Sequence, residues 1–249
     1  MGRGLLLLHG FTGSPASFHS VTAGLPSWVA VFAPSLVGHG DQVHAEVSGF
    51  DDEVDRIAAL LSDTMPWHLA GYSLGGRIAL GLLARHPNLF SSAILIGAQP
   101  GLPTESARTE RRAADDRWCN LLRERPLSEF VSAWEDQPLF HSQRTLSGEV
   151  LSRQRAERLA QDPGGLVRSL TLTGLGAMPA YWEALPEIQV PTVLIAGSND
   201  EKFTAIAREM AAKMPNARLE IVPESGHNVV LERPDAVRAL LERAVAVGR

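Results

Sequence analysis

The chain has 249 residues, of which 45% are hydrophobic and 20% are charged, and its formal net charge is −5 at pH 7. These values are typical of a globular protein with a large core, and they argue against binding to nucleic acid or to an anionic membrane surface. No apolar run has the length of a membrane span or of a signal-peptide core. The single cysteine, Cys119, excludes an intramolecular disulfide and a cysteine-based metal cluster, so we expect a reducing, cytoplasmic location.

Short apolar runs alternate with amphipathic segments along the chain. The runs are continuous and brief, as in strands that are buried on both faces of a parallel sheet. They predict strands at residues 5–8, 29–33, 68–72, 93–96, 191–196 and 219–222. The amphipathic segments predict helices at residues 14–25, 51–61, 74–86, 203–214 and 234–245. Because strands and helices alternate, we expect a doubly wound, mostly parallel α/β sheet of about six strands.

The pattern changes between residues 100 and 186. This segment contains no strand-like run, and its helical stretches are interrupted at Pro126, Pro138, Pro163 and Pro179. It is too long for a simple loop, so it predicts a helical lid inserted into a core formed by residues 1–99 and 187–249. In open parallel sheets the ligand lies outside the carboxyl ends of the strands, and we expect the lid to cover that place.

The sequence Gly71-Tyr72-Ser73-Leu74-Gly75 separates a predicted strand from a predicted helix. Strand, Gly-x-Ser-x-Gly turn and helix together form the context of a nucleophile elbow, in which the serine is exposed on a strained turn. Glycines two residues before and two residues after the serine remove the Cβ atoms that would collide there. We therefore take Ser73 as the candidate catalytic nucleophile or base.

Two further polar residues follow predicted strands in the order that a catalytic triad requires. Asp200 follows the strand at 191–196, and His227 follows the last strand. A serine hydroxyl becomes reactive when an imidazole takes its proton and a carboxylate orients that imidazole. The order Ser73, Asp200, His227 is that of α/β-hydrolases. Glu201 is the alternative acid, although Asp200 is nearer the strand end.

Backbone amides and cations complete the candidate site. The elbow motif predicts oxyanion-hole N–H groups from Leu74 and from Phe11 in the loop after the first strand. Arg77 lies in the first turn of the elbow helix, where the helix dipole disfavours a cation, and it suggests an anionic substrate. Lys202 is a second cation near a helix start. For both cations, the alternative is a side chain that extends into solvent.

The lid segment is rich in arginine, but acidic residues alternate with the arginines. Most of this pattern is typical of a solvated, salt-bridged helix face, and spacing alone selects no lid arginine for the site. Two tryptophans, Trp118 and Trp134, are more often core residues than ligand contacts on helices of this kind. The arginines concerned are Arg108, Arg111, Arg112, Arg117 and Arg158.

The chain resembles the 2-succinyl-6-hydroxy-2,4-cyclohexadiene-1-carboxylate synthases, which are lyases of menaquinone biosynthesis with the α/β-hydrolase fold. The resemblance rests on motifs spread over nearly the whole chain. These are His9-Gly10-Phe11, Gly71 to Arg77, Pro100-Gly101-Leu102, Arg108, Glu110, Arg111, Asp116-Arg117-Trp118, Asp200-Glu201-Lys202-Phe203 and Gly226-His227-Asn228.

The resemblance implies a specific chemistry. It implies the triad Ser73, Asp200 and His227, and a reaction that eliminates pyruvate from 2-succinyl-5-enolpyruvyl-6-hydroxy-3-cyclohexene-1-carboxylate after proton abstraction. It implies substrate contacts from Tyr72, Arg77, Arg111, Trp134, Arg158 and Lys202. The expected partner is a small polycarboxylate, with no metal, organic cofactor, nucleic acid or membrane, and the expected state is a monomer or homodimer.

Two other functions remain open at this point. A serine carboxylesterase or C–C bond hydrolase would use the same triad through an acyl-enzyme. A non-catalytic ligand-binding protein of this fold is the third reading, which the intact Ser-Asp-His set argues against.

Overall fold

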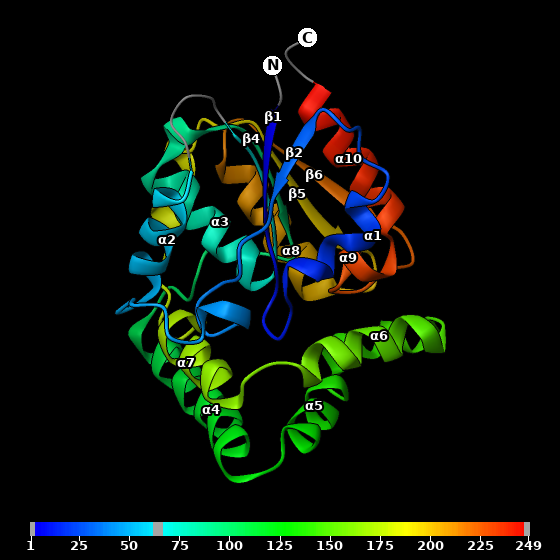
Figure 1. Cartoon of the computed structure of the whole chain (residues 1–249). Coiled ribbons are helices and arrows are strands. Elements are labelled where there is room, and N and C mark those ends of the chain that lie inside the picture. The colour runs from blue at the N-terminus through cyan, green and yellow to red at the C-terminus, as the bar shows by residue number, and fades with distance from the viewer. Residues whose placement is uncertain (1–2, 62–66, 247–249) are drawn as a thin grey trace.

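The computed structural model describes residues 3–61 and 67–246. Its centre is a parallel sheet of six strands in the order β2-β1-β3-β4-β5-β6 (Figure 1). The strands are β1 (Arg3–Leu8), β2 (Val29–Phe32), β3 (Trp67–Tyr72), β4 (Phe90–Ile96), β5 (Thr192–Gly197) and β6 (Ala217–Val222). The predicted α/β class with about six parallel strands is confirmed.

Helices cover both faces of the sheet. Successive side chains of a strand point to opposite faces, so Leu6 and Leu8 of β1 pack in one core cluster and Leu5 and Leu7 in another. The first cluster contains residues of α2 (Phe50–Ala59), α3 (Leu74–Arg85) and α8 (Glu201–Lys213). The second contains residues of α1 (His19–Thr22), α9 (Val229–Glu232) and α10 (Pro234–Ala246). This double coverage explains why the strand sequences are apolar without alternation.

The first helical stretch is shorter than predicted. The expected helix at 14–25 consists of a 3₁₀ turn, η1 (Pro15–Phe18), followed by the single turn α1. Ser14 caps η1, and the chain leaves α1 at Ala23, just before Gly24 and Pro26. Glycine and proline both disfavour continuation of a helix, which accounts for the difference. None of the helices in the described ranges is both long and apolar enough to cross a membrane.

The segment between β4 and β5 lies beyond the carboxyl ends of the strands (Figure 1). It contains α4 (Glu105–Glu124), α5 (Leu127–Glu135), the 3₁₀ turn η4 (Pro138–Thr145), α6 (Gly148–Leu159) and α7 (Pro163–Thr173). From Leu175 onward, Met178, Tyr181 and Leu185 pack into the same core cluster as α2 and α3. The chain therefore rejoins the core before the predicted lid boundary at residue 186. We refer to α4–α7 as the lid.

Candidate active site

Ser73 occupies the turn between β3 and α3. Its backbone has φ 52° and ψ −106°, a left-handed conformation that is rarely adopted by non-glycine residues. Hydrogen bonds on both sides hold this conformation: the Ser73 amide donates to Ile96 O at 2.8 Å, and the Arg77 amide donates to Ser73 O at 3.0 Å. Strain of this kind persists only where the surroundings fix it, and it is common at functional sites.

Glycines allow the elbow to pack closely. A Cβ on Gly71 would collide with the carbonyl of Gly75, and a Cβ on Gly75 would collide with the carbonyls of Leu8 and His9. The Gly75 amide also donates to His9 O at 3.0 Å. The elbow helix and the first strand thus touch backbone to backbone, which fixes Ser73 relative to the loop after β1.

Replacing Gly75 with alanine is expected to lower the free energy of unfolding by about 3 kcal/mol, because the new methyl group meets backbone atoms that cannot move without shifting β1. Urea denaturation measures the change. The matched control is Gly148→Ala at the start of α6, where a Cβ would meet no atom within 4 Å. That variant is expected to differ from the parent by less than about 1 kcal/mol. Equal stabilities of the two variants would contradict this account of the elbow.

Ser73, His227 and Asp200 form a hydrogen-bonded chain. Ser73 Oγ lies 3.1 Å from His227 Nε2, and Asp200 Oδ2 lies 2.9 Å from His227 Nδ1. The carboxylate can only accept, so Nδ1 carries the proton and Nε2 is free to accept from the serine hydroxyl. Asp200 is held in turn, because its Oδ1 accepts from the Phe203 amide at 3.2 Å. This geometry can move a proton from Ser73 to His227.

A cavity of about 290 Å³ opens in front of Ser73 and beneath the lid. Five of the six residues expected to contact substrate line it: Tyr72, Arg77, Arg111, Trp134 and Lys202. Phe11 and Leu74, the expected oxyanion residues, line it as well. In the described part of the chain, no Asp or Glu side chain is among the lining residues. The cavity therefore combines a serine–histidine pair with three cations.

Arg77 is the most deeply placed of these cations. Its Nη1 donates to the Thr173 carbonyl of α7 at 2.8 Å, and no carboxylate of the described residues lies within ion-pair distance of it. Burial, with a smaller contribution from the nearby guanidinium of Arg111 and an opposing one from Asp115, lowers the pKa of Arg77 to about 9. At pH 7 the side chain remains protonated. The fold thus keeps a cation in the cavity wall against an electrostatic cost, which indicates an anionic ligand.

Arg111 is the one member of the arginine-rich face of α4 that reaches the cavity. Its Nε donates to Asp115 Oδ1 at 2.8 Å. Burial raises the pKa of Asp115, and the positive charge of Arg111 opposes that effect. The neighbouring Arg108 and Arg112 instead bond to Glu105 and to backbone carbonyls, as in the solvated face that the sequence suggested.

Arg158 is placed differently from the expectation that it contacts substrate. It does not line the cavity of Ser73. Its Nη1 donates to Glu135 Oε1 at 3.0 Å, and its guanidinium lies 5.3 Å from the centre of the Phe140 ring. The side chain lines a separate cavity of about 240 Å³ between α5 and α6, where Arg155 also pairs with Glu135. Neutralisation by the Glu135 carboxylate explains this position, which the sequence spacing did not indicate.

Several cavity residues were missed by sequence reasoning. Gln99 lines the cavity just beyond β4, and its position after a strand end was an available signal. Ser169 and Thr173 line it from α7, at a four-residue spacing that places them on one helix face but does not reveal which face points to the site. Trp134, which helix position alone favoured as a core residue and which the resemblance implied as a substrate contact, lines the cavity, and its buried indole N–H has no hydrogen-bond partner among the described residues.

The described residues contain no group of three or more His, Cys, Asp or Glu side chains that could hold a metal ion. Two buried histidines, His9 and His39, instead accept backbone amides: His9 Nε2 from Leu36 and His39 Nε2 from Thr12, each at 3.1 Å. Burial lowers the pKa of His9 to about 4 and that of His39 to about 3, with the mutual repulsion of the two rings adding to the effect at His39.

These depressed pKa values make stability sensitive to acid. An unfolded histidine binds a proton near pH 6.5, whereas the folded rings stay neutral, so stability is complete above pH 6.5 and is lost as the pH falls towards 4. Between pH 7 and pH 5 each ring is expected to remove about 2 kcal/mol from the free energy of unfolding. Urea denaturation at both pH values tests this, with His39→Gln as the comparison. The variant should lose less stability than the parent, and equal losses would contradict the assignment.

Comparison with known proteins agrees with this geometry. Residues 5–240 match the model of the Alpha/beta hydrolase family, so the chain belongs to that family. The chain is 37% identical over 236 residues to a Bacillus subtilis (strain 168) protein named provisionally as a 2-succinyl-6-hydroxy-2,4-cyclohexadiene-1-carboxylate synthase. It is 34% identical over 243 residues to the synthase of that name from Enterobacter sp. (strain 638). These alignments cover 92% and 95% of this chain and 85% and 89% of the relatives.

The solved structure of MenH from S. aureus superimposes with a TM-score of 0.94 and 33% identity, covering 98% of this chain and 93% of that one. The chain belongs to the 2-succinyl-6-hydroxy-2,4-cyclohexadiene-1-carboxylate synthase family. The resemblance seen in the sequence is confirmed. The protein is an enzyme of the α/β-hydrolase fold with lyase activity and a role in menaquinone biosynthesis.

Proposed function

We propose that this enzyme eliminates pyruvate from 2-succinyl-5-enolpyruvyl-6-hydroxy-3-cyclohexene-1-carboxylate to give 2-succinyl-6-hydroxy-2,4-cyclohexadiene-1-carboxylate. The observation that carries the proposal is the cavity of Ser73, which three cations line and which no carboxylate of the described residues lines. The substrate bears three carboxylates, so cations suit it better than they suit a neutral ester. We also propose that the enzyme works in the cytoplasm, without cofactor, as a monomer or homodimer.

The bonds that change follow from the two compounds. The proton on C2, next to the succinyl ketone, is removed, and the C3=C4 double bond becomes C2=C3 and C4=C5. The C5–O bond breaks, and the leaving enolpyruvate takes up a proton to become pyruvate. Deprotonation next to a ketone places negative charge on the ketone oxygen, so the reaction needs a base and an oxyanion site at the same place.

Ser73 and His227 provide the base in this proposal. Transfer of the serine proton to His227 Nε2, at 3.1 Å, would leave the serine oxygen able to take the C2 proton. Asp200, at 2.9 Å from Nδ1, would stabilise the imidazolium that forms. The proton on His227 is then available to the leaving enolpyruvate.

The amides of Phe11 and Leu74 would receive the developing charge. Both residues line the cavity together with Ser73, and neither amide donates to another group among the described residues. Leu74 is also the first residue of α3, where the helix dipole favours a negative charge. Two free donors at this point can stabilise an enolate oxygen.

The remaining residues would position the carboxylates. Arg77 and Arg111 enter the cavity from α3 and α4, and Lys202 enters from the start of α8. The indole N–H of Trp134, which has no partner within the described ranges, and the buried ring of Tyr72 complete the wall. A substrate with several separated carboxylates can occupy these donors at once, which fixes C2 relative to Ser73.

Turnover tests the proposal directly. The enzyme is incubated with the cyclohexene substrate, and pyruvate and the cyclohexadiene are quantified against a sample without enzyme. Equal, enzyme-dependent release of the two products is expected. The competing esterase or C–C hydrolase function predicts instead that small activated esters are hydrolysed and that this substrate yields no pyruvate, an outcome that would overturn the proposal.

A further inference from the structure

Two histidines join the loop after β1 to the loop after β2, and the triad uses neither of them. We call residues 9–13 the oxyanion loop and residues 35–42 the brace loop. His9 of the oxyanion loop accepts the Leu36 amide of the brace loop, and His39 of the brace loop accepts the Thr12 amide of the oxyanion loop. Both bonds are 3.1 Å long, and the rings meet edge to face at 4.9 Å between centres. Each loop thus donates one backbone amide to the histidine of the other loop.

The hydrogen bonds set the tautomer of each ring. His39 Nδ1 lies 3.1 Å from Val37 O, and His9 Nδ1 lies 2.8 Å from Gly10 O. A carbonyl can only accept, so each Nδ1 carries the proton, and each Nε2 is left with a lone pair for a backbone amide. Both rings must therefore be neutral to hold the two loops together, in agreement with their burial.

The bond from Thr12 acts on a strained part of the oxyanion loop. Thr12 is β-branched, yet it has φ 65°, a conformation that such residues rarely adopt without external support. Phe11, whose amide is the expected oxyanion donor, directly precedes it, and the Phe11 ring lies edge to face on His39 at 5.7 Å. His39 therefore contacts the loop on both sides of the peptide bond between Phe11 and Thr12.

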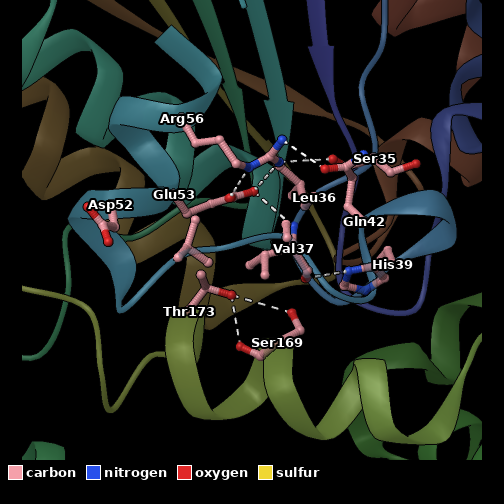
Figure 2. A network of polar contacts seen from close by, with 12 residues as sticks. Ser35, Leu36, Val37, His39, Gln42, Asp52, Glu53, Arg56, Ser169 and Thr173 are labelled. Carbon is pink, nitrogen blue, oxygen red and sulfur yellow. Dashed lines mark hydrogen bonds and ion pairs between the residues drawn. The ribbon is translucent and has the colours of Figure 1, made fainter. Parts of the chain in front are cut away.

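Two side chains of α2 fix the brace loop in turn. Glu53 of α2 is fully buried and accepts the Val37 amide at 2.9 Å, while Arg56 pairs with Glu53 at 2.6 Å and donates to Ser35 O at 3.1 Å (Figure 2). On its other side the loop meets α7 of the lid, where Gly38 and Gly165 touch backbone to backbone. His39 thus projects from a rigid support rather than from a mobile loop.

We propose that His39 is a positioning residue for the oxyanion hole: its Nε2 lone pair holds the Thr12 amide and so fixes the neighbouring Phe11 amide in front of Ser73. The oxyanion role of Phe11 rests on the proposed function. His39 orients this donor before charge develops, and an oxyanion donor is effective only when it is already in place at that moment.

Two variants separate positioning from packing. His39→Leu removes the lone pair, and its kcat is expected to fall by about 10²-fold, as after loss of one oxyanion donor, with KM within about threefold of the parent. His39→Gln returns an acceptor near the Nε2 position and should recover at least tenfold of that loss. The control is His68→Leu in β3, which removes a buried imidazole bonded to Ser92 at 2.8 Å, at the end of the strand remote from Ser73. It should lose stability but keep kcat.

The kcat values of the two His39 variants decide whether His39 has the positioning role. If His39→Leu keeps the parental kcat, or if His39→Gln is no better than His39→Leu, the positioning role is wrong. Turnover by the parent enzyme tests the proposed function separately, and an activated ester provides a second substrate, because an oxyanion hole serves both reactions. Nitrogen NMR of the parent at pH 7 needs no activity: it should show His39 neutral with its proton on Nδ1, and a proton on Nε2 would overturn the inference.

Discussion

Ser73→Ala is expected to lower kcat for pyruvate elimination by at least about 10⁴-fold, the size of effect seen when a triad member is removed. Ser73 and His227 both line the cavity, but in the proposed reaction it is the serine oxygen that takes the C2 proton, after His227 Nε2 at 3.1 Å has accepted the proton of the serine hydroxyl. KM should change little, because in the proposed function the carboxylates of the substrate are bound by Arg77, Arg111 and Lys202, which the substitution leaves in place. Steady-state kinetics with the cyclohexene substrate measures both constants.

Asp200→Asn is the companion to this variant. The amide can present its NH₂ group to His227 Nδ1, which favours the wrong tautomer and leaves Nε2 protonated, so a loss of about 10⁴-fold is again expected. The double variant should be scarcely worse than Ser73→Ala, because the residues act as one unit. If either single variant retained more than a tenth of the parental kcat, the triad would not be the base.

Arg77→Met is expected to lower kcat/KM by about 10² to 10³-fold, because it leaves a substrate carboxylate without its partner in a desolvated site. Methionine keeps the length of the side chain but removes the charge. The same change should raise the free energy of unfolding by about 1 kcal/mol. Burial lowers the pKa of Arg77, which shows that the folded state pays a cost to hold this cation without an ion pair, and methionine removes that cost. Kinetics and urea denaturation give the two values.

The control for Arg77 lies on the lid. Arg117 is exposed on α4 and does not line the cavity, so Arg117→Met should stay within about twofold of the parent in kcat/KM. Normal turnover by Arg77→Met would contradict the electrostatic role of this residue. A variant that loses both activity and stability would show that Arg77 supports the fold through its bond to Thr173 instead of binding substrate.

Much of the fold could be predicted because the strands of a parallel sheet are buried on both faces and are therefore continuous apolar runs in the sequence. The runs at Leu5–Leu8 and around Ile94 and Ile195 are apolar on both faces, and each is a central strand. The helix at 14–25 could not be placed correctly, because the pattern does not show that Gly24 and Pro26 end it early. The partner of the segment from Leu175 to Leu185 could not be predicted either, because periodicity does not show that its apolar side chains pack in the core cluster.

Candidate site residues can be placed from the sequence most readily where the backbone dictates the position. Ser73, Asp200 and His227 each follow a strand, and parallel strands bring their carboxyl ends to one edge. The cavity residues of the lid were harder to predict, because the rotation of each helix and its tertiary packing determine which side chains face the cavity. Periodicity does not show that Ser169 faces the cavity, or that Glu135 holds Arg158 away from it.

The central claim is that Ser73 acts as a base and is not acylated. Rapid-quench mass spectrometry of the peptide that contains Ser73, taken during turnover of the cyclohexene substrate, tests it most directly, with pyruvate and the cyclohexadiene quantified in the same samples. We expect the two products in equal amounts and an unmodified Ser73 peptide at every time point. A covalent ester on Ser73 that forms and decays at the rate of turnover would contradict the account.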